Sequence, residues 1–148
     1  HPDIANTLNN LGHLYARQNR HTEAELLYDK ALKISETKFG LDHPISMSSI
    51  WGLAVVSHWQ GKSTQAEKFY LRAIEAYEKI FGKNHTDVAT ILDNLANLLH
   101  SQSRYSEAEP LYRRALAINE QVLGKDHPNT QIVRDNLQNL LETIDSKQ

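Results

Sequence analysis

The 148-residue chain contains no cysteine, which excludes disulfides, thiol nucleophiles and metal sites built on cysteine. It also lacks the roughly 20 consecutive apolar residues that a membrane-spanning helix needs, and no basic-then-apolar leader opens it. Neither sign of charge prevails, because 16 basic residues are balanced by 18 acidic ones. This balance gives no electrostatic reason to expect nucleic acid or an anionic membrane as a partner. We therefore expect a soluble, cytoplasmic protein that binds neither, and its start at His1 predicts a processed chain or a fragment.

What the sequence contains instead is a pattern that repeats every 42 residues. Columns of leucine, alanine and tyrosine recur at this spacing, and four histidines mark it: His1, His43, His85 and His127. We number positions within a repeat from this histidine. The pattern predicts one domain over residues 1–148, made of repeats at 1–42, 43–84 and 85–126 and one further helix at 127–145.

Each repeat predicts a pair of amphipathic helices, because apolar residues recur three and four places apart and strand-like alternation is absent. The second helix of each pair is predicted to begin at a capping box, in which a hydroxyl and a glutamate satisfy free amides of the first turn. These boxes are Thr22 to Glu25, Thr64 to Glu67 and Ser106 to Glu109. Each second helix is predicted to end at a glycine, which adopts the left-handed conformation without steric cost: Gly40, Gly82 and Gly124.

The two ends of the array differ in polarity. In the closing helix, Arg134 and Gln138 replace the apolar and small residues of earlier repeats, and we expect both to face the place of a missing partner helix. The first repeat keeps Ile4 and Leu14 and has no polar cap. We therefore expect the closing helix to be a solvated cap, and the first repeat to be covered by more chain or by another subunit.

The run Leu11-Gly12-x-x-Tyr15, followed by Ala24-x-x-x-Tyr28-x-x-Ala31, resembles the signature of tetratricopeptide repeats. The 42-residue length, with His-Pro at the junctions, is similar to the kinesin-light-chain subtype. The resemblance implies an all-α fold: a right-handed α-solenoid of three helix pairs and a C-terminal capping helix, seven helices in all. It also implies a concave groove, lined by first helices, that binds a protein or peptide segment.

The groove is predicted to be lined by the sixth, ninth, tenth, thirteenth and seventeenth positions, which the packed columns leave free, with two histidines beside them. Asparagine dominates these positions, and a side-chain amide can pair with the backbone of an extended peptide. The candidate groove residues are Asn6, Asn9, Asn10, His13 and Arg17; Trp51, Gly52, Val55, His58 and Trp59; Thr90, Asp93, Asn94, Asn97, His100 and Ser101; and Asp135, Asn136 and Asn139.

The second repeat departs from the asparagine pattern. Trp51, Val55 and Trp59 form a stripe four residues apart, and Gly52 costs about 1 kcal/mol in a helix relative to alanine. One hypothesis is an apolar pocket floored by the tryptophans, in which Gly52 clears space for an anchor side chain of the partner. The alternative is that the indoles pack as core, against Tyr77 or a neighbouring helix.

The histidines and the charges of the groove narrow the kinds of ligand that it is expected to bind. His58 and His100 share a column near His13, but no third ligand lies at a suitable spacing, so we predict no metal site. The groove's acidic groups, Asp93, Asp135 and Glu142, outnumber the lone Arg17, which favours a neutral or mildly basic ligand.

No catalytic constellation or cofactor motif is apparent, so we expect no enzyme activity and no cofactor. The predicted function is a scaffold for protein–protein interaction. The alternative is an assembly element that stacks through its uncapped N-terminal repeat within a larger protein, including self-association through that face.

Overall fold

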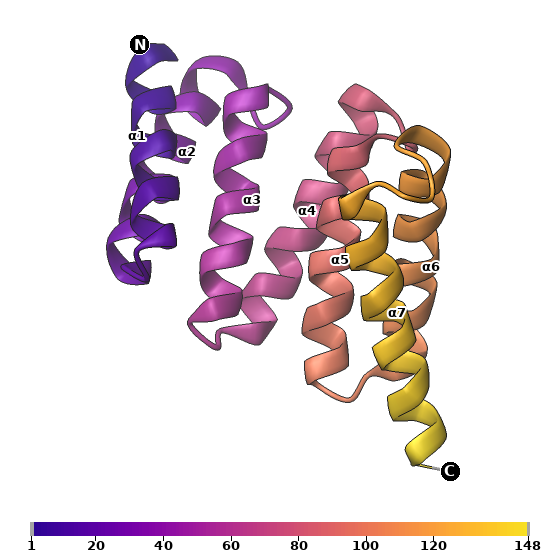
Figure 1. Cartoon of the computed structure of the whole chain (residues 1–148). Helices are drawn as coiled ribbons and strands as arrows, with labels where there is room; N and C mark the ends of the chain where they lie inside the picture. The colour runs from indigo at the N-terminus through magenta and orange to yellow at the C-terminus, as the bar shows by residue number, and fades with distance from the viewer. Residues whose placement is uncertain (1, 148) are drawn as a thin grey trace. The chain divides into compact units, whose positions relative to one another are not determined.

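The computed structural model describes residues 2–147, so His1 of the histidine column lies outside the described residues. Within these residues the structure has seven helices and no strand, which confirms the all-α prediction of three helix pairs and a closing helix (Figure 1). The helices are α1 (Pro2–Arg17), α2 (His21–Phe39), α3 (Pro44–Trp59), α4 (Ser63–Phe81), α5 (Thr86–Ser101), α6 (Tyr105–Val122) and α7 (Pro128–Ser146). We call α1, α3, α5 and α7 the first helices, and α2, α4 and α6 the second helices.

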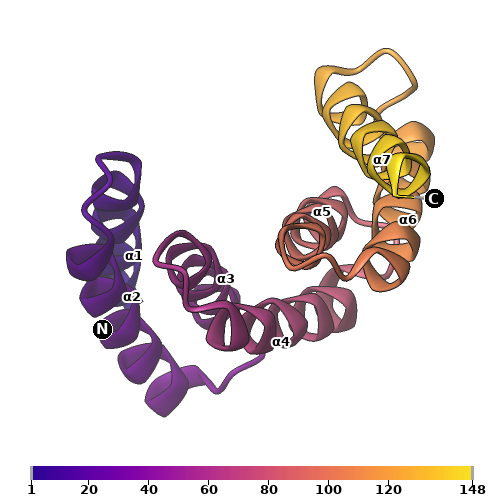
Figure 2. The ribbon, with the colours of Figure 1, turned by 90° about the horizontal axis from the view of Figure 1, so that it is seen from below.

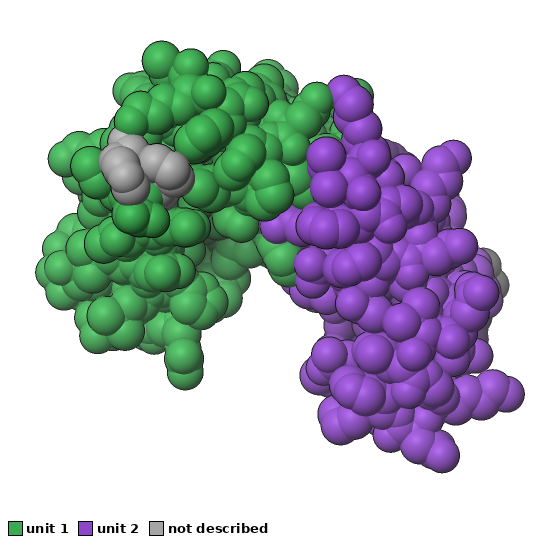
Figure 3. Space-filling model, turned by 90° about the horizontal axis from the view of Figure 1, so that it is seen from above, with its two compact units in different colours: residues 1–76 green, residues 77–148 purple. Residues whose placement is uncertain are grey.

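The chain divides into two compact units, residues 1–76 and 77–148 (Figure 3). In the first unit, α1 contacts both α2 and α3, and α2 contacts α3. In the second unit, α5 contacts both α6 and α7, and α6 contacts α7 (Figure 2). Each unit therefore places two first helices side by side, α1 with α3 and α5 with α7.

The helix pairs close over columns of small residues. Ala54 and Ala96 of the first helices are fully buried, and so are their counterparts in the second helices, Ala24, Ala66 and Ala108. Alanine lets two helix backbones approach closely, and large side chains fill the space beside such a contact. The tyrosine column does this, since Tyr28, Tyr70 and Tyr112 are all buried.

The capping boxes predicted for α2 and α6 are wrong. Both α2 and α6 begin one residue earlier, at His21 and Tyr105, so the predicted hydroxyl caps lie inside the first turn. The position before α2 is held by Arg20, whose side chain forms no cap and whose Nε donates to Glu23 at 2.8 Å. The same ion pair recurs in α6 between Arg104 and Glu107. The residue before α2 and α6 is thus an arginine that pairs with a glutamate of the first turn and makes no cap hydrogen bond.

The junctions between repeats use glycine and histidine. Gly40 follows α2 with φ of 82°, in the left-handed region, as predicted for the residue that ends a helix. The next helix is capped by a histidine, because Nδ1 of His43 accepts a hydrogen bond from the Ile45 amide at 3.2 Å. His85 and His127 cap α5 and α7 in the same way. The histidine column therefore supplies the N-caps of α3, α5 and α7.

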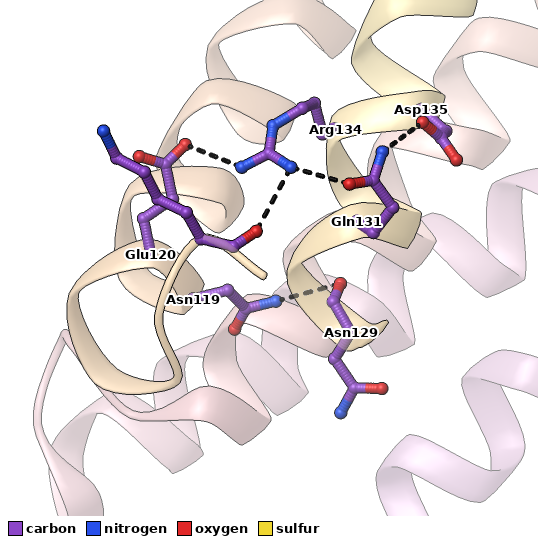
Figure 4. A network of polar contacts seen from close by, with 7 residues as sticks. Asn119, Glu120, Asn129, Gln131, Arg134 and Asp135 are labelled. Carbon is purple, nitrogen blue, oxygen red and sulfur yellow. Dashed lines mark hydrogen bonds and ion pairs between the residues drawn. The ribbon is translucent and has the colours of Figure 1, made fainter. Parts of the chain in front are cut away.

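The polar residues of α7 have two different roles. Gln138 is exposed and donates to Glu142 of the same helix, as expected on a side without a partner helix. Arg134 does not face a missing helix, and that prediction is wrong. Its guanidinium donates to the carbonyl of Lys125 at 3.2 Å and forms an ion pair with Glu120 of α6 (Figure 4). Arg134 thus joins α7 to the end of the preceding helix pair.

Candidate binding surface

One stripe of each first helix stays open to solvent. It consists of the sixth, tenth, thirteenth and seventeenth positions, which lie on one face because they are three or four residues apart. None of the sixteen residues is buried, and fifteen of them carry a side chain, the exception being Gly52. They are Asn6, Asn10, His13 and Arg17 in α1; Ser48, Gly52, Val55 and Trp59 in α3; Thr90, Asn94, Asn97 and Ser101 in α5; and Ile132, Asn136, Asn139 and Thr143 in α7. We call this set the exposed stripe.

The ninth position is internal in α1, contrary to its predicted place on the open face. Asn9 is only 8% exposed, and its Nδ2 donates to the carbonyl of Ile45 at 3.2 Å. Its Oδ1 accepts from the hydroxyl of Ser49 at 2.7 Å. Both partners belong to the start of α3. Asn9 therefore links the first repeat to the second instead of facing a ligand.

Asp93, also at the ninth position, has the same linking role in the second unit. It is 8% exposed and accepts hydrogen bonds from the amide of Asn136 in α7 at 3.0 and 3.2 Å. Burial raises the pKa of Asp93, while the hydrogen bond from Asn136 acts in the opposite direction. In α7 the ninth position is Asp135, which is exposed and accepts from Gln131. Asp93 therefore joins two first helices, α5 and α7. Because its carboxylate is buried, the groove is less acidic than predicted.

Gly52 does not clear space for a ligand, and this part of the pocket hypothesis is wrong. A Cβ added at Gly52 would lie 2.5 Å from Cε1 of Tyr28, so the ring of a neighbouring second helix already fills that space. The two tryptophans of α3 differ in exposure. Trp51 and Val55 are half-buried, whereas Trp59 is 55% exposed and meets the ring of His21 edge-on, with centroids 5.3 Å apart.

The thirteenth and sixteenth positions hold the tyrosine column in place. Nδ1 of His58 lies 3.0 Å from the hydroxyl of Tyr70, and burial lowers the pKa of His58 and raises that of Tyr70. In the next repeat the hydroxyl of Tyr112 donates to Asn97 instead. His100 meets the Tyr112 ring edge-on, with centroids 6.5 Å apart. His58, Asn97 and His100 are half-buried, so each combines a packing role with partial access to solvent.

Sequence reasoning missed three members of the exposed stripe: Ser48, Ile132 and Thr143. The 42-residue repeat could have identified them, because each lies at a repeat position that was predicted to line the groove in other repeats. No group of three metal-ligating side chains occurs in the part of the chain that the structure describes. Among the same residues, no helix is long and apolar enough to cross a membrane.

This arrangement of helix pairs, small-residue contacts and histidine-capped junctions defines a helical repeat protein. Tetratricopeptide repeat models match residues 4–45, 46–121 and 87–144, so the chain belongs to the tetratricopeptide repeat family. The match over 4–45 is as long as one period. The predicted family is confirmed, and proteins of this repeat fold are typically non-catalytic.

Solved structures agree with this assignment. The chain is similar to BtubC (BKLC) from P. vanneervenii, with 28% identity and a TM-score of 0.89 over 96% of this chain and 57% of that one. It also resembles a putative kinesin light chain from Podosopora anserina, with 20% identity, a TM-score of 0.83 and coverage of 95% and 66%. The N-terminal domain of stress-induced protein-1 from C. elegans has the fold at 18% identity and a TM-score of 0.66, with coverage of 91% and 95%. No curated protein matches the chain.

Proposed function

We propose that the exposed stripe binds an extended segment of another protein, and that the chain is a cytoplasmic scaffold without enzyme activity. The observation that carries this proposal is that two of the three tenth-position asparagines have side-chain amides unpaired among residues 2–147, whereas the third, Asn136, bonds to Asp93. The side chains of Asn10 and Asn94 lie on the stripe and make no hydrogen bond to the described part of the chain. A side-chain amide both donates and accepts, which matches the alternating groups of a peptide backbone.

The pairing of first helices within each unit supports the same proposal. Because Asn136 of the α7 stripe donates to Asp93, the residue before Asn94 in α5, the two stripes approach each other there. Asn94 and Asn97 of α5 therefore share a surface with Asn139 of α7. Two adjacent rows of amides and hydroxyls can hold both edges of an extended segment. The side chains of that segment would be less restricted than its backbone.

Trp59 is the apolar anchor in this proposal. Its indole is 55% exposed on α3, beside α1, where Arg17 occupies the same repeat position. Aromatic and arginine side chains contribute most of the binding energy at many protein interfaces. In the second unit, the exposed Asp135 and Glu142 lie next to the stripe. These charges favour a segment that is neutral or mildly basic there.

The test is selection from a random-peptide library on the immobilised chain, followed by fluorescence anisotropy with the selected peptides. We expect Trp59→Ala to weaken binding by about thirtyfold or more, as for a hot spot of about 2 kcal/mol. Asn94→Ala should weaken it by about tenfold, the loss expected for one or two hydrogen bonds.

The control is Gln121→Ala, which alters an exposed amide of α6 outside the stripe and should leave affinity unchanged. Selected peptides that bind the Trp59 and Asn94 variants as tightly as the unaltered chain would show that the stripe is not the binding surface.

A second candidate function is assembly through the first repeat. The observation that favours it is the exposure of Ile4 and Leu14, which are 54% and 48% exposed at the outer side of α1.

A further inference from the structure

The carboxylate of Asp93 is buried without a cation to neutralise it. Among residues 2–147, the only group that donates to it is the amide of Asn136, whose Nδ2 lies 3.0 and 3.2 Å from its two oxygens. No lysine, arginine or histidine of these residues forms an ion pair with it. Burial of a carboxylate beside a neutral donor costs folding free energy, and burial raises the pKa of Asp93 for the same reason. A charge held at a cost to stability is a candidate for a binding function.

The link between α5 and α7 does not require this charge. Asn9 occupies the same repeat position in α1 and also joins two first helices, but it does so as a neutral amide. Its Nδ2 donates to the carbonyl of Ile45, and its Oδ1 accepts from the hydroxyl of Ser49. An asparagine at position 93 would likewise keep an oxygen that accepts from Asn136. The negative charge of Asp93 is therefore available for another role.

Asp93 lies at the edge of the exposed stripe. On α5 it follows Thr90 by three residues and precedes Asn97 by four, so the three share one side of the helix. Thr90 and Asn97 belong to the stripe of α5, and the hydrogen-bond partner Asn136 belongs to the stripe of α7. The carboxylate is therefore recessed beside the surface that the two stripes form. No stripe residue of α5 or α7 has a basic side chain that would repel a cation there.

The hydrogen bond from Asn136 favours an ammonium group over a guanidinium. Its Nδ2 is within hydrogen-bond distance of both oxygens of Asp93, so it occupies the edge at which an arginine forms two parallel bonds. An ammonium needs only one oxygen, and lysine carries it on a flexible four-carbon stem that can reach a recessed group. Oδ1 of Asn136 accepts no hydrogen bond from residues 2–147, which leaves a further acceptor next to the carboxylate.

We propose that Asp93 binds the side-chain ammonium of a lysine in the segment held by the exposed stripe, and that it selects lysine over arginine and over neutral side chains. The ion pair neutralises the buried charge, so the complex recovers free energy that the charge costs the unbound chain. This inference rests on the proposed function. It adds the identity of one side chain of the bound segment and the residue that recognises it.

Parallel selections from a random-peptide library test the proposal, one on the unaltered chain and one on Asp93→Asn. Peptides selected by the unaltered chain should share a lysine at one position, and those selected by the variant should not. The substitution keeps the oxygen that accepts from Asn136, so the link between α5 and α7 is retained. Asp135→Asn is the matched control, because it changes the exposed carboxylate at the same repeat position and should still select the lysine. Circular dichroism checks that both variants are folded.

Synthetic forms of one selected peptide test the chemistry of the contact. Their N-terminus is acetylated, and the shared position holds lysine, acetyl-lysine or arginine, so that lysine provides the only ammonium. In fluorescence anisotropy, acetyl-lysine should bind the unaltered chain about tenfold more weakly than lysine, and this difference should fall below about twofold in Asp93→Asn. Arginine should also bind the unaltered chain more weakly than lysine.

The outcomes separate this inference from the proposed function. Peptides that lose affinity for Asn94→Ala but share no lysine, or whose preference for lysine persists in Asp93→Asn, would overturn the inference and leave the proposed function intact. Equal binding of lysine and arginine would overturn the selection between them. If no peptide is selected, or if none is sensitive to Asn94→Ala or Trp59→Ala, the proposed function fails and the inference fails with it.

Discussion

The ring of Tyr28 lies directly against Gly52, so closely that a Cβ on the glycine would be 2.5 Å from Cε1 of the ring. Gly12 contacts the same ring, and a Cβ there would lie 3.1 Å from Cε1. Tyr28 of α2 is thus held between a glycine of α1 and a glycine of α3. The ring has no room to move away from one of them without approaching the other.

Gly52→Ala should therefore destabilise the protein. Overpacking of a core costs about 1–3 kcal/mol, and the gain of about 1 kcal/mol in helix propensity offsets only part of it. Chemical denaturation measures the difference. In a Tyr28→Leu background the same substitution should be neutral or stabilising, because the ring is gone. An equal loss in both backgrounds would mean that the ring is not the cause.

Asn9→Ala should cost about 1–2 kcal/mol of folding free energy, because it removes the two buried hydrogen bonds that tie α1 to the Ile45 carbonyl and the Ser49 hydroxyl of α3. Asn10→Ala changes the next residue, which is exposed, and should alter stability by less than about 0.5 kcal/mol. Urea denaturation of the pair separates an internal link from a surface amide. The assignment fails if the two variants are equally stable.

Asp93→Asn should stabilise the chain at neutral pH, because it removes a buried charge and keeps an oxygen that accepts from Asn136. The raised pKa of Asp93 means that the folded state holds the carboxyl proton more tightly than the unfolded state does. The stability that the protonated Asp93 carboxyl adds to the folded state is complete below the unfolded pKa, and it is lost as the pH rises through the folded pKa. The advantage of the variant should therefore shrink as the pH falls from 7 toward 3.8.

Denaturation midpoints of both proteins across this range provide the measurement. Asp135→Asn is the matched control, because it changes the exposed carboxylate at the same repeat position and should not reproduce the effect. A constant difference between wild type and the Asp93 variant at all pH values would contradict the interpretation.

His127→Ala should destabilise the chain by about 1 kcal/mol, the usual loss when an N-cap side chain is removed. Nδ1 of His127 accepts from the Asn129 amide at 3.1 Å at the start of α7. His127→Asp should recover most of the loss, because a carboxylate oxygen caps the same amide. Thermal unfolding compares the three proteins, and an aspartate no better than alanine would argue against the capping role.

The sequence predicts features that depend on the sterics of a single residue, or on residues that recur at the same repeat position. The glycine after α2 is predicted correctly because glycine adopts a positive φ without steric cost, whatever the neighbouring helices do. The ninth position was misplaced because its burial depends on the next helix: Asn9 is enclosed by α3, and Asp93 is held by α7. Gly52 was misread for the same reason, since the ring that fills its space comes from Tyr28, in another repeat. A pattern within one helix does not show which neighbour will close over it.

The contacts within each unit have a consequence for how the chain reaches this structure during synthesis. Each of them joins helices that are one or two places apart along the chain, as α1, α2 and α3 are. Contacts of low sequence separation form quickly, since little loop entropy is lost before they are made. A helix leaving the ribosome therefore finds its packing partners within the unit either already synthesised or among the next two helices of the chain. The first three helices can assemble before the last residues of the chain have been translated.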